Sequence, residues 1–406
     1  MTAVAIPRRA VLAALLAGLS MFGPFCIDAI FPAFPAIAAQ FRASTVAMQQ
    51  TISVYLIAYA AMSLLLGAFS DAWGRRNVIL VGVTVFLLAS VGCALAQTMP
   101  MLLLFRALQG SSAGLGLIVG RALIRDCYEG ADAQRLMAQI SMIFGVAPAL
   151  APVVGAWLVA LGGWHLLFWA LAAFAALWLL LCALILPETH PPEARSPLSP
   201  APLLRRYGTI IAAAEFQLLA WTLIFNFAGL FLYVASAPGF ILDVLHLNQD
   251  QFYWLFVPAI CGLVLGSSLA GRLAGRISVR ATLNIGSGIM LGAALLNVAI
   301  AWWMVPARVP WAVLPIAVAG IGINFIAPTV NLLVIDCFPQ FRGSASSVQA
   351  CMSLTFCAVL AGLVAPWLGD DALQLALASL VLYLLGFVAW RGYRLLATRR
   401  PAPPQA

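Results

Sequence analysis

The stretch Gly67-Ala-Phe-Ser-Asp71-Ala-Trp-Gly74-Arg75-Arg76 lies between two long apolar runs of the chain. Asp71, Arg75 and Arg76 form the first dense group of charges after the N-terminus. A polar, glycine-bearing turn this short, placed between runs long enough to cross a bilayer, indicates a connection between two membrane-spanning segments.

The composition supports a membrane protein. Of 406 residues, 64% are hydrophobic and only 8% are charged, whereas soluble domains carry about 25% charged residues. Apolar runs of about 20 residues recur along the chain, and each is long enough to cross a hydrocarbon layer of about 30 Å as a helix. The runs are continuously apolar and lack the alternation of barrel strands. We therefore predict an all-α membrane protein.

The apolar runs predict twelve spans. The first run continues from Ala10 to about Ile37, too long for a signal peptide, so we expect it to remain as an uncleaved first span. The predicted spans cover residues 10–38, 48–70, 77–97, 100–122, 136–160, 164–186, 209–238, 251–271, 279–304, 310–334, 344–368 and 372–392.

Arginine is distributed unevenly between the loops on the two sides. All 21 basic residues are Arg. Only Arg42 and Arg308 fall in the loops of one side, and Arg106 lies within a span. The remaining 18 fall at the other side, at Arg8, Arg9, Arg75, Arg76, Arg121, Arg125, Arg135, Arg195, Arg205, Arg206, Arg272, Arg276, Arg280, Arg342, Arg391, Arg394, Arg399 and Arg400. The positive-inside rule then predicts that both termini are cytoplasmic.

A Pro-rich segment divides the spans six and six. It covers residues 187–208, has little to bury, and is typical of a cytoplasmic linker. We therefore predict two six-helix halves, residues 1–186 and 209–406, the second with a short cytoplasmic tail. A weak internal repeat agrees, because Gly271–Arg280 follows span eight as Gly67–Arg76 follows span two. The repeat has Gly275 where the first half has Asp71.

The sequence carries no pattern typical of an enzyme, a metal site or a nucleic-acid-binding protein. The net charge of +8 comes from Arg residues scattered in ones and twos between spans. The eight Cys form no C-x-x-C pair, and the three His lie far apart. HExxH and P-loop motifs are absent from the sequence. We expect no cofactor and no metal, so that an ion gradient or simple equilibration supplies the energy.

Asp28 is the acidic residue that the sequence places deepest in a span. Pro24, Pro32 and Pro35 bracket it, and prolines suit a helix that bends. Ionisable residues inside a membrane are costly and are functional candidates. Loss of water around a carboxyl favours its neutral form, so Asp28 could bind and release a proton. The alternative is a hydrated acid at the outer end of the span with a structural role.

Arg106 is the corresponding basic residue, near the start of span four. Arginine keeps its charge, so it would act as a fixed positive group whose donors bind carbonyls, a carboxylate or water. Taken alone, Arg106 is better explained as a side chain that reaches the outer interface. Gln109, one turn later, is a candidate partner in a cavity.

Two further sets of residues are candidates. In span five, Gly145, Pro148, Pro152 and Gly155 predict a bent helix with a thin face that another helix can approach; a packing kink without a role in transport explains them equally. Candidates for a substrate cavity, which are more often simply packed or interfacial, are Tyr55, Tyr59, Gln109, Asn226, Phe231 and Tyr233.

Four of these stretches resemble the major facilitator superfamily of transporters. Gly67–Arg76 resembles its loop signature G-x-x-x-D-R-x-G-R-R, and Arg106–Gly110 its span-four motif R-x-x-Q-G. Gly145–Gly155 resembles its span-five antiporter motif. Asp28–Ile37 and residues 225–242 resemble the bicyclomycin/chloramphenicol-resistance (Bcr/CflA) branch of drug:proton antiporters. Ala72 replaces the loop Arg, and Ala151 and Ala156 replace Gly in the antiporter motif.

The resemblance implies roles for the loop residues. Gly67, Asp71, Gly74, Arg75 and Arg76 would form a cytoplasmic latch that controls which side of the transporter opens. Asp71 would cap or pair with a helix end of the other half. Arg75, and with it Arg76, would pair with an acid after span four, for which Asp126 is the candidate. Arg76 is also explained as an ordinary positive-inside residue.

The resemblance also implies a function. We expect a monomeric, multi-pass protein of the bacterial inner membrane that exports a small amphipathic substrate or drug in exchange for protons, with Asp28 and Arg106 in proton coupling. One alternative is a metabolite exporter or importer of the same fold. An intramembrane enzyme would need a polar cluster at one depth, and a sensor would need a soluble output domain; the sequence indicates neither.

Overall fold

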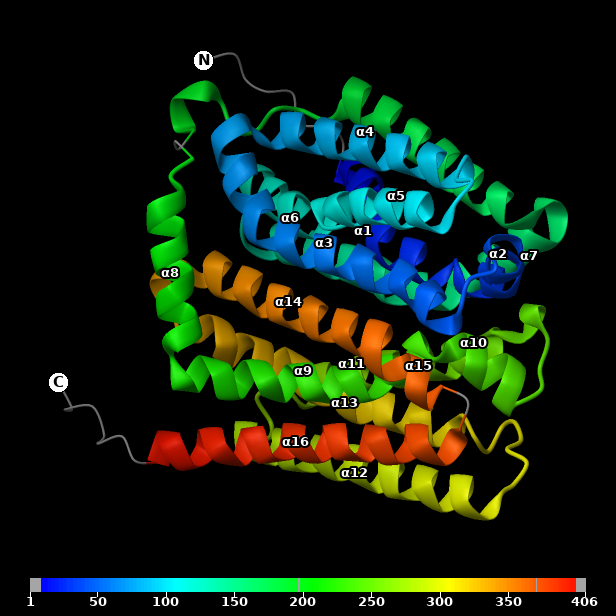
Figure 1. Cartoon of the computed structure of the whole chain (residues 1–406). Coiled ribbons are helices and arrows are strands. Elements are labelled where there is room, and N and C mark those ends of the chain that lie inside the picture. The colour runs from blue at the N-terminus through cyan, green and yellow to red at the C-terminus, as the bar shows by residue number, and fades with distance from the viewer. Residues whose placement is uncertain (1–8, 196–197, 370, 399–406) are drawn as a thin grey trace. The chain divides into compact units, whose positions relative to one another are not determined.

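A computed structural model describes residues 9–195, 198–369 and 371–398 (Figure 1). Within these ranges the regular structure is entirely helical. Arg8, Arg399 and Arg400, which entered the charge distribution above, lie outside the described residues. The chain divides into two compact units. The first takes in Met1–Ser199, Leu247–Phe256 and Cys357–Trp367, and the second takes in Pro200–His246, Val257–Phe356 and Leu368–Ala406.

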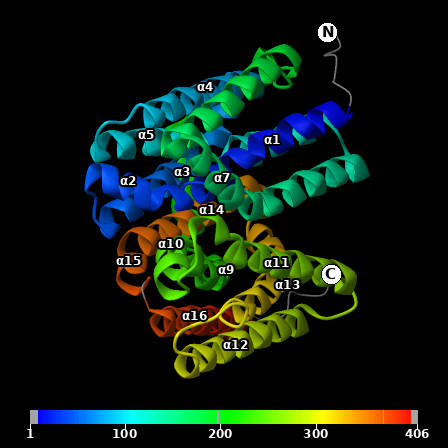
Figure 2. The same cartoon turned by 90° about the vertical axis from the view of Figure 1, so that its right-hand side faces the viewer.

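The first unit holds the helices of the first half of the chain. They are α1 (Arg9–Asp28), a 3-10 turn (Phe31–Ala33), α2 (Phe34–Phe41), α3 (Thr45–Trp73), α4 (Arg75–Ala94), α5 (Met99–Ser112), α6 (Leu115–Cys127), α7 (Gly130–Ile185) and a 3-10 turn (Pro192–Ala194). Within it, α1 and α4 both pack on α7, and α3 and α4 both pack on α5 (Figure 2).

Most helices of the second half of the chain lie in the second unit, although parts of α11, α14 and α15 and the turns beside them are assigned to the first. The helices are α8 (Pro200–Ala212), α9 (Ala214–Ala235), α10 (Ala237–Gly239), a π-helical turn (Phe240–Val244), a 3-10 turn (Gln249–Gln251), α11 (Tyr253–Leu273), α12 (Val279–Trp303), α13 (Leu314–Asp336), a 3-10 turn (Pro339–Phe341), α14 (Arg342–Val359), a π-helical turn (Leu360–Val364), α15 (Ala365–Leu368) and α16 (Ala372–Thr398). Within the second unit, α9 packs on α16 and α12 packs on α13.

Eleven helical segments in the described residues are long and apolar enough to cross a membrane. The count is eleven because α7 joins the predicted spans 136–160 and 164–186. The backbone of α7 leaves helical geometry at Gly162 (φ −156°) and Gly163 (φ +73°), which are the residues between those two spans. Glycine is suited to the positive φ at this bend because it has no Cβ. Twelve predicted spans and eleven segments therefore agree.

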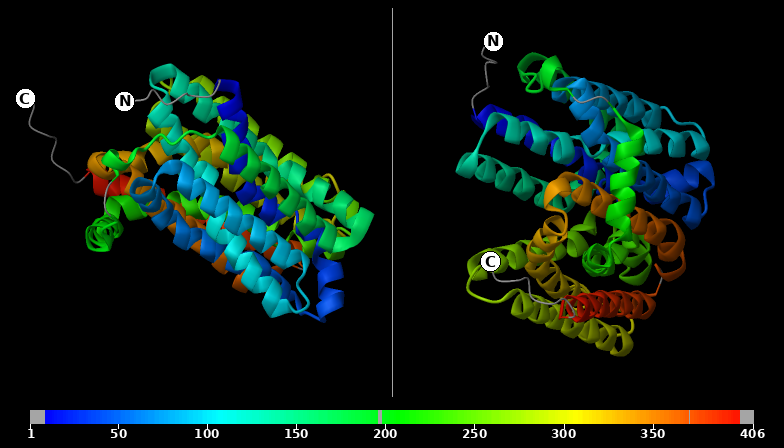
Figure 3. Two further views of the ribbon diagram at one scale, coloured as in Figure 1. Left: turned by 90° about the horizontal axis from the view of Figure 1, so that it is seen from above. Right: turned by 90° about the vertical axis from the view of Figure 1, so that its left-hand side faces the viewer.

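Two predicted spans are interrupted within their bounds, and one predicted boundary was wrong. Span one corresponds to Arg9–Phe41, in which α1 ends at Asp28 and α2 begins at Phe34. Span four corresponds to Met99–Cys127 and is likewise divided into α5 and α6. Span seven begins at Ala214 rather than at 209, because residues 200–212 form the separate helix α8 (Figure 3, the green helix in the right panel). The last part of the predicted linker is therefore helical.

Helix α8 forms because its apolar residues fall on one side, where Tyr207 and Ile210 are buried. Burial raises the pKa of the Tyr207 phenol above its ordinary value, so the group stays neutral at physiological pH. Elsewhere, short polar loops start the spans. Ser44, Thr98 and Ser278 each accept a hydrogen bond from a backbone N–H in the first turn of the helix that follows, which is the usual N-cap arrangement.

Candidate functional site

The first span is interrupted directly after Asp28. Pro32 and Pro35 lie in the first turns of the 3-10 segment and of α2, where the missing N–H of proline costs nothing. The end of α1 leaves carbonyl groups of its last turn without partners in the helix. Because this end is buried, those carbonyls need donors from other helices.

Arg106 on α5 is such a donor. Its Nη1 donates to the carbonyl oxygen of Cys26 at 3.2 Å, and its Nε donates to the carbonyl oxygen of Thr51 on α3 at 3.2 Å. The side chain is completely buried, so Arg106 does not reach the outer interface. A positive charge is favourable at the C-terminal end of a helix because the carbonyl dipoles point there. Arg106 therefore caps the broken end of α1.

Gln109 extends this cap to α4. Its side-chain oxygen accepts from Nη1 of Arg106 at 3.1 Å, and its Nε2 donates to Oγ of Ser90 at 2.9 Å. The thiols of Cys26 and Cys93 lie 3.5 Å and 3.6 Å from the same Gln109 oxygen. All these side chains are buried. We call Arg106, Gln109, Ser90, Cys26 and Cys93 the arginine network.

Asp28 lies at the edge of the arginine network without joining it. Its side chain is only 4% exposed, yet among the described residues it forms neither a hydrogen bond nor an ion pair. Arg106 has no carboxylate partner in the same part of the chain, and its Nη2 makes no hydrogen bond. The structure brings the two predicted proton-coupling residues to one helix break but leaves their charges unpaired.

Gly155 of the predicted antiporter helix meets the same break. A Cβ atom at Gly155 would lie 2.1 Å from the carbonyl oxygen of Ala29, so only glycine allows α7 to approach the residue after Asp28 this closely. Pro152 is buried one turn earlier on α7. Gly145 is exposed with open space around it, and Pro148 is half-buried. The Gly155 end of the antiporter motif thus packs at the break of span one, and the Gly145 end does not.

Tyr55 and Tyr59 on α3 are buried in the first unit. The Tyr55 hydroxyl donates to the Gly23 carbonyl of α1 at 3.1 Å, and the Arg106 guanidinium lies 4.6 Å from the centre of the Tyr55 ring. That distance is within the range of a cation–π contact. Tyr55 and Gln109, predicted as cavity residues, therefore both contact Arg106.

The other three predicted cavity residues lie together on α9 in the second unit. Asn226, Phe231 and Tyr233 are all buried. Asn226 lies against Gly386 of α16, and Phe231 stacks on Phe227. Of these three residues, Tyr233 lines a cavity within the second unit.

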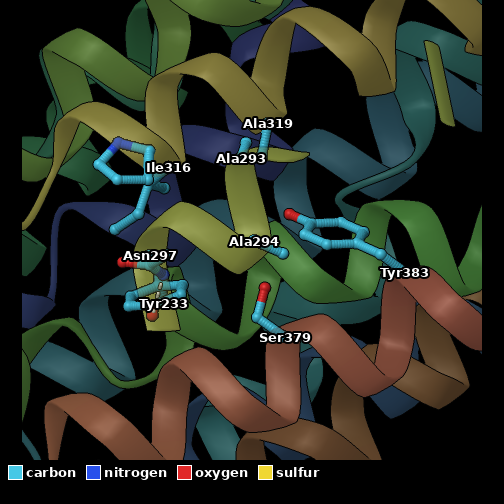
Figure 4. Close-up of a pocket in the computed structure, with 9 residues that line it drawn as sticks. Tyr233, Ala293, Ala294, Asn297, Ile316, Ala319, Ser379 and Tyr383 are labelled. Carbon is cyan, nitrogen blue, oxygen red and sulfur yellow. Dashed lines mark hydrogen bonds between the residues drawn. The ribbon is translucent and has the colours of Figure 1, made fainter. Parts of the chain in front are cut away.

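That cavity lies among α9, α12, α13 and α16 (Figure 4). The Tyr233 hydroxyl accepts a hydrogen bond of 2.7 Å from the side-chain nitrogen of Asn297. Ser379 and Tyr383 of α16 also line the cavity. Its volume is about 10 Å³, which is room for about one water molecule. It is too small for a drug-sized compound.

The loop residues that opened the sequence analysis form a charged cluster in the first unit. Helix α3 runs through Asp71 to Trp73 and α4 begins at Arg75, so Gly74 alone connects them and Asp71 is helical rather than in a turn. Arg75 forms an ion pair with Asp71, and its Nε lies 3.2 Å from Oδ2 of Asp126. The predicted pair Arg75–Asp126 is therefore in contact.

The remaining loop residues have separate contacts. An acid near the C-terminal end of a helix, such as Asp71 on α3, is unfavourable alone, and the ion pair with Arg75 offsets this. Arg76 donates from Nη2 to the Ala183 carbonyl at 2.7 Å, so it joins α4 to α7. Among the described residues, no other element comes within 4 Å of the position that a Cβ of Gly67 would take.

Glu188 is a residue beside this cluster that the sequence analysis missed. Its Oε1 accepts a hydrogen bond of 2.9 Å from the backbone N–H of Arg75. The next residue, Thr189, donates to Oδ2 of Asp126 at 2.9 Å. An acid two residues after the end of an apolar span was the available signal. Its partner could not be read from the sequence, because α4 lies more than a hundred residues earlier. We call Asp71, Arg75 and Asp126 the loop cluster, and Glu188 contacts it through the backbone of Arg75.

In the described residues, no three or more His, Cys, Asp or Glu side chains come together as a metal site would require. The chemistry available at the break is hydrogen bonding, a fixed positive charge and an unpaired carboxyl.

Comparisons with known proteins agree with one another. A sequence model of the Major Facilitator Superfamily matches residues 10–362. The uncharacterized MFS-type transporter YdgK of Bacillus subtilis is 30% identical, with 95% of this chain and 96% of that protein covered. The bicyclomycin resistance protein homolog of Haemophilus influenzae is 26% identical, with 87% and 88% covered. Multidrug resistance protein D of Escherichia coli is 29% identical, with 90% and 91% covered.

Solved structures show the same fold. A bacterial homolog of the human lysosomal transporter Spinster, in an inward-facing and occupied conformation, matches with a TM-score of 0.73 over 98% of this chain and 99% of its own, at 17% identity. The human organic anion transporter MFSD10 (TETRAN) matches with a TM-score of 0.68 over 94% of this chain and 99% of its own, at 18% identity.

Proposed function

The chain belongs to the Major Facilitator Superfamily, and from this premise we propose that it exports small amphipathic compounds, drugs among them, in exchange for protons. It is a multi-span membrane transporter and not an enzyme. The names of two relatives, a bicyclomycin resistance protein homolog and a multidrug resistance protein, support drugs as the substrate class.

The observation that carries the proposal is the unpaired Asp28 at the break of span one. A carboxyl that lies out of water and has no ion pair is suited to bind and release a proton. Arg106 caps the same break, Gly155 of the antiporter helix packs on the next residue, and two of the relatives are named as resistance proteins. In the proposed cycle, Asp28 takes a proton from outside as substrate leaves and releases it inward.

The proton gradient supplies the energy in this proposal, with no cofactor. Each proton that moves inward yields about 2.3 kcal/mol per 100 mV of membrane potential and about 1.4 kcal/mol per pH unit. The halves 1–186 and 209–406 alternate in the side that they open, and the loop cluster acts as the latch between the two states. The protein works as a monomer in the bacterial inner membrane with both termini cytoplasmic, as the distribution of Arg predicts.

A growth assay tests the function. The chain is expressed in a host that lacks its own efflux pumps, and the minimal inhibitory concentration is measured across a panel of amphipathic drugs, with and without an uncoupler of the proton gradient. We expect raised resistance to at least one compound and the loss of that resistance with the uncoupler. No change for any compound would instead favour a metabolite transporter of the same fold, and resistance that survives the uncoupler would contradict proton coupling.

A further inference from the structure

We propose that Glu188 is a positioning residue of the latch: its carboxylate fixes the start of α4 and so sets the Arg75 side chain between Asp71 and Asp126. The inference rests on the proposed role of the loop cluster as a latch. It adds a residue from the segment that follows α7, which neither the loop signature nor the comparisons assign.

The start of α4 lacks a side-chain cap from its own segment. The first N–H groups of a helix have no partners within it, and Gly74, the residue before α4, has no side chain with which to cap them. Oε1 of Glu188 accepts the N–H of Arg75 at 2.9 Å. A negative charge is favourable at this end because the helix dipole is positive there. Glu188 thus supplies the cap that the local sequence lacks.

The Glu188 carboxylate lies close to the Cα of Gly74. The φ of Gly74 is +95°, in the region that favours glycine. A Cβ at this position would lie 2.4 Å from Oε2 of Glu188. Gly74 of the loop signature therefore leaves room for the Glu188 carboxylate. A residue with a Cβ at position 74 would displace that carboxylate from the start of α4.

The segment after α7 contacts both Arg75 and the Asp126 carboxylate that pairs with it. Glu188 also accepts the N–H of His190 at 3.0 Å, which folds the segment back on itself. Thr189 donates to Oδ2 of Asp126, the same oxygen that lies 3.2 Å from Nε of Arg75. Two consecutive residues after α7 therefore bind the backbone of Arg75 and its carboxylate partner. A shift of this segment would move both.

The charges around Arg75 are unequally shared. Its side chain pairs with Asp71 and Asp126, whereas Nη2 of Arg195 lies 3.9 Å from Oε2 of Glu188. The Arg75 side chain is only 9% exposed. The interaction energy of a mostly buried cation with two acids depends strongly on its position, because Coulomb energies change steeply with distance where water is scarce.

The test uses Cys127, the half-buried residue directly after Asp126, as a native reporter. Its rate of alkylation by a membrane-impermeant maleimide is measured in inside-out vesicles by mass spectrometry of the peptide, and ethidium efflux is measured alongside. The variants are Glu188→Ala, which removes the acceptor, and Glu188→Gln, which keeps an oxygen acceptor without the charge. The control is Glu193→Gln, an exposed acid five residues further along the same segment.

We expect Glu188→Ala to raise the alkylation rate of Cys127 about fivefold, the effect expected from loss of a helix cap, and to slow ethidium efflux. Glu188→Gln should restore both rates to within about twofold, because an uncharged oxygen still caps the N–H. Glu193→Gln should match the wild type. If Glu188→Ala does not fold, Thr189→Val replaces it and should raise the alkylation rate by a smaller factor.

Two results would overturn the inference. The first is a wild-type alkylation rate at Cys127 in Glu188→Ala, or in Thr189→Val where it replaces that variant. The second is a Gln variant as impaired as the Ala variant. A wild-type protein that does not export ethidium would count against the proposed function for that compound, while the alkylation rates would still decide the role of Glu188.

Discussion

The two units place different chemistry at related positions of their helices. Cys93 on α4 and Asn297 on α12 follow the repeated arginines Arg76 and Arg280 at the same spacing. Around Cys93 the first unit packs a guanidinium, an amide and thiols. Around Asn297 the second unit has a tyrosine hydroxyl and a cavity with room for about one water molecule. The difference teaches that the first unit carries a buried charge at this position, whereas the second unit has uncharged polar groups there and serves as a neutral frame, by which we mean a structural support without a buried charge.

The largest effect should come from Arg106. Arg106→Lys keeps the charge but loses the planar fork that donates to Cys26, Thr51 and Gln109. Removing a partner from a buried charged network costs about 3–5 kcal/mol, so we expect efflux per folded molecule to fall by more than about tenfold. Drug efflux from cells, normalised to protein in the membrane, measures this.

The control for Arg106 is Arg308→Lys, at an exposed arginine in a loop of the second unit. It should leave efflux unchanged. Normal efflux in Arg106→Lys would show that charge alone suffices at the break and would remove the main contrast between the units.

A smaller effect is expected in the loop cluster, with a defined order. The Asp126 side chain is 25% exposed and that of Asp71 is 51% exposed. Because solvent weakens exposed ion pairs, Asp126→Asn should slow turnover more than Asp71→Asn. We expect a few-fold loss for the first and about twofold for the second, since exposed pairs contribute about 0.2–1 kcal/mol.

Substrate binding should be intact in both variants, because the cluster is proposed to control the opening of the transporter and not to touch the substrate. Turnover and equilibrium binding of one transported drug in proteoliposomes separate the two. Wild-type turnover in Asp71→Asn would refute its place in the latch, and the reverse order of the two variants would refute the argument from exposure.

The smallest effect on transport is expected in the second unit. Tyr233→Phe removes the acceptor of the Asn297 hydrogen bond and leaves a buried donor unpaired. The cost in unfolding free energy should be about 1–3 kcal/mol, seen as a lower thermal midpoint of the purified protein. Efflux per folded molecule should not change. A loss of efflux as large as that of Arg106→Lys would end the view of this half as a neutral frame.

Much of the fold followed from the sequence because bilayer thickness sets the length of each apolar run. The runs do not show where a helix breaks inside a span. The prolines around Asp28 indicated a bend, but the separation of α1 from α2 depends on Arg106 as a donor from α5. Helix α8 was missed because its short amphipathic stretch lies in a Pro-rich segment.

The candidate site was partly predictable because the bilayer makes ionisable residues rare inside spans. Asp28 and Arg106 stood out because ionisable residues inside spans are rare, and the pair Arg75–Asp126 followed from a family resemblance. Glu188 did not stand out, because an acid in a loop is ordinary and its importance comes from a contact with a distant helix. The aromatic candidates had no distinguishing signal, and in the structure the Tyr55 hydroxyl donates to the Gly23 carbonyl of the interrupted first span.

The central claim, that Asp28 couples substrate export to proton movement, is tested most directly by proton flux. In inside-out vesicles with an acidified interior, a pH-sensitive dye reports proton release when a transported drug is added. The wild type should release protons, and so should Asp250→Asn, a change at an exposed acid in the 3-10 turn Gln249–Gln251. Asp28→Asn should release none. Drug-induced proton release at the wild-type rate in Asp28→Asn would contradict the account.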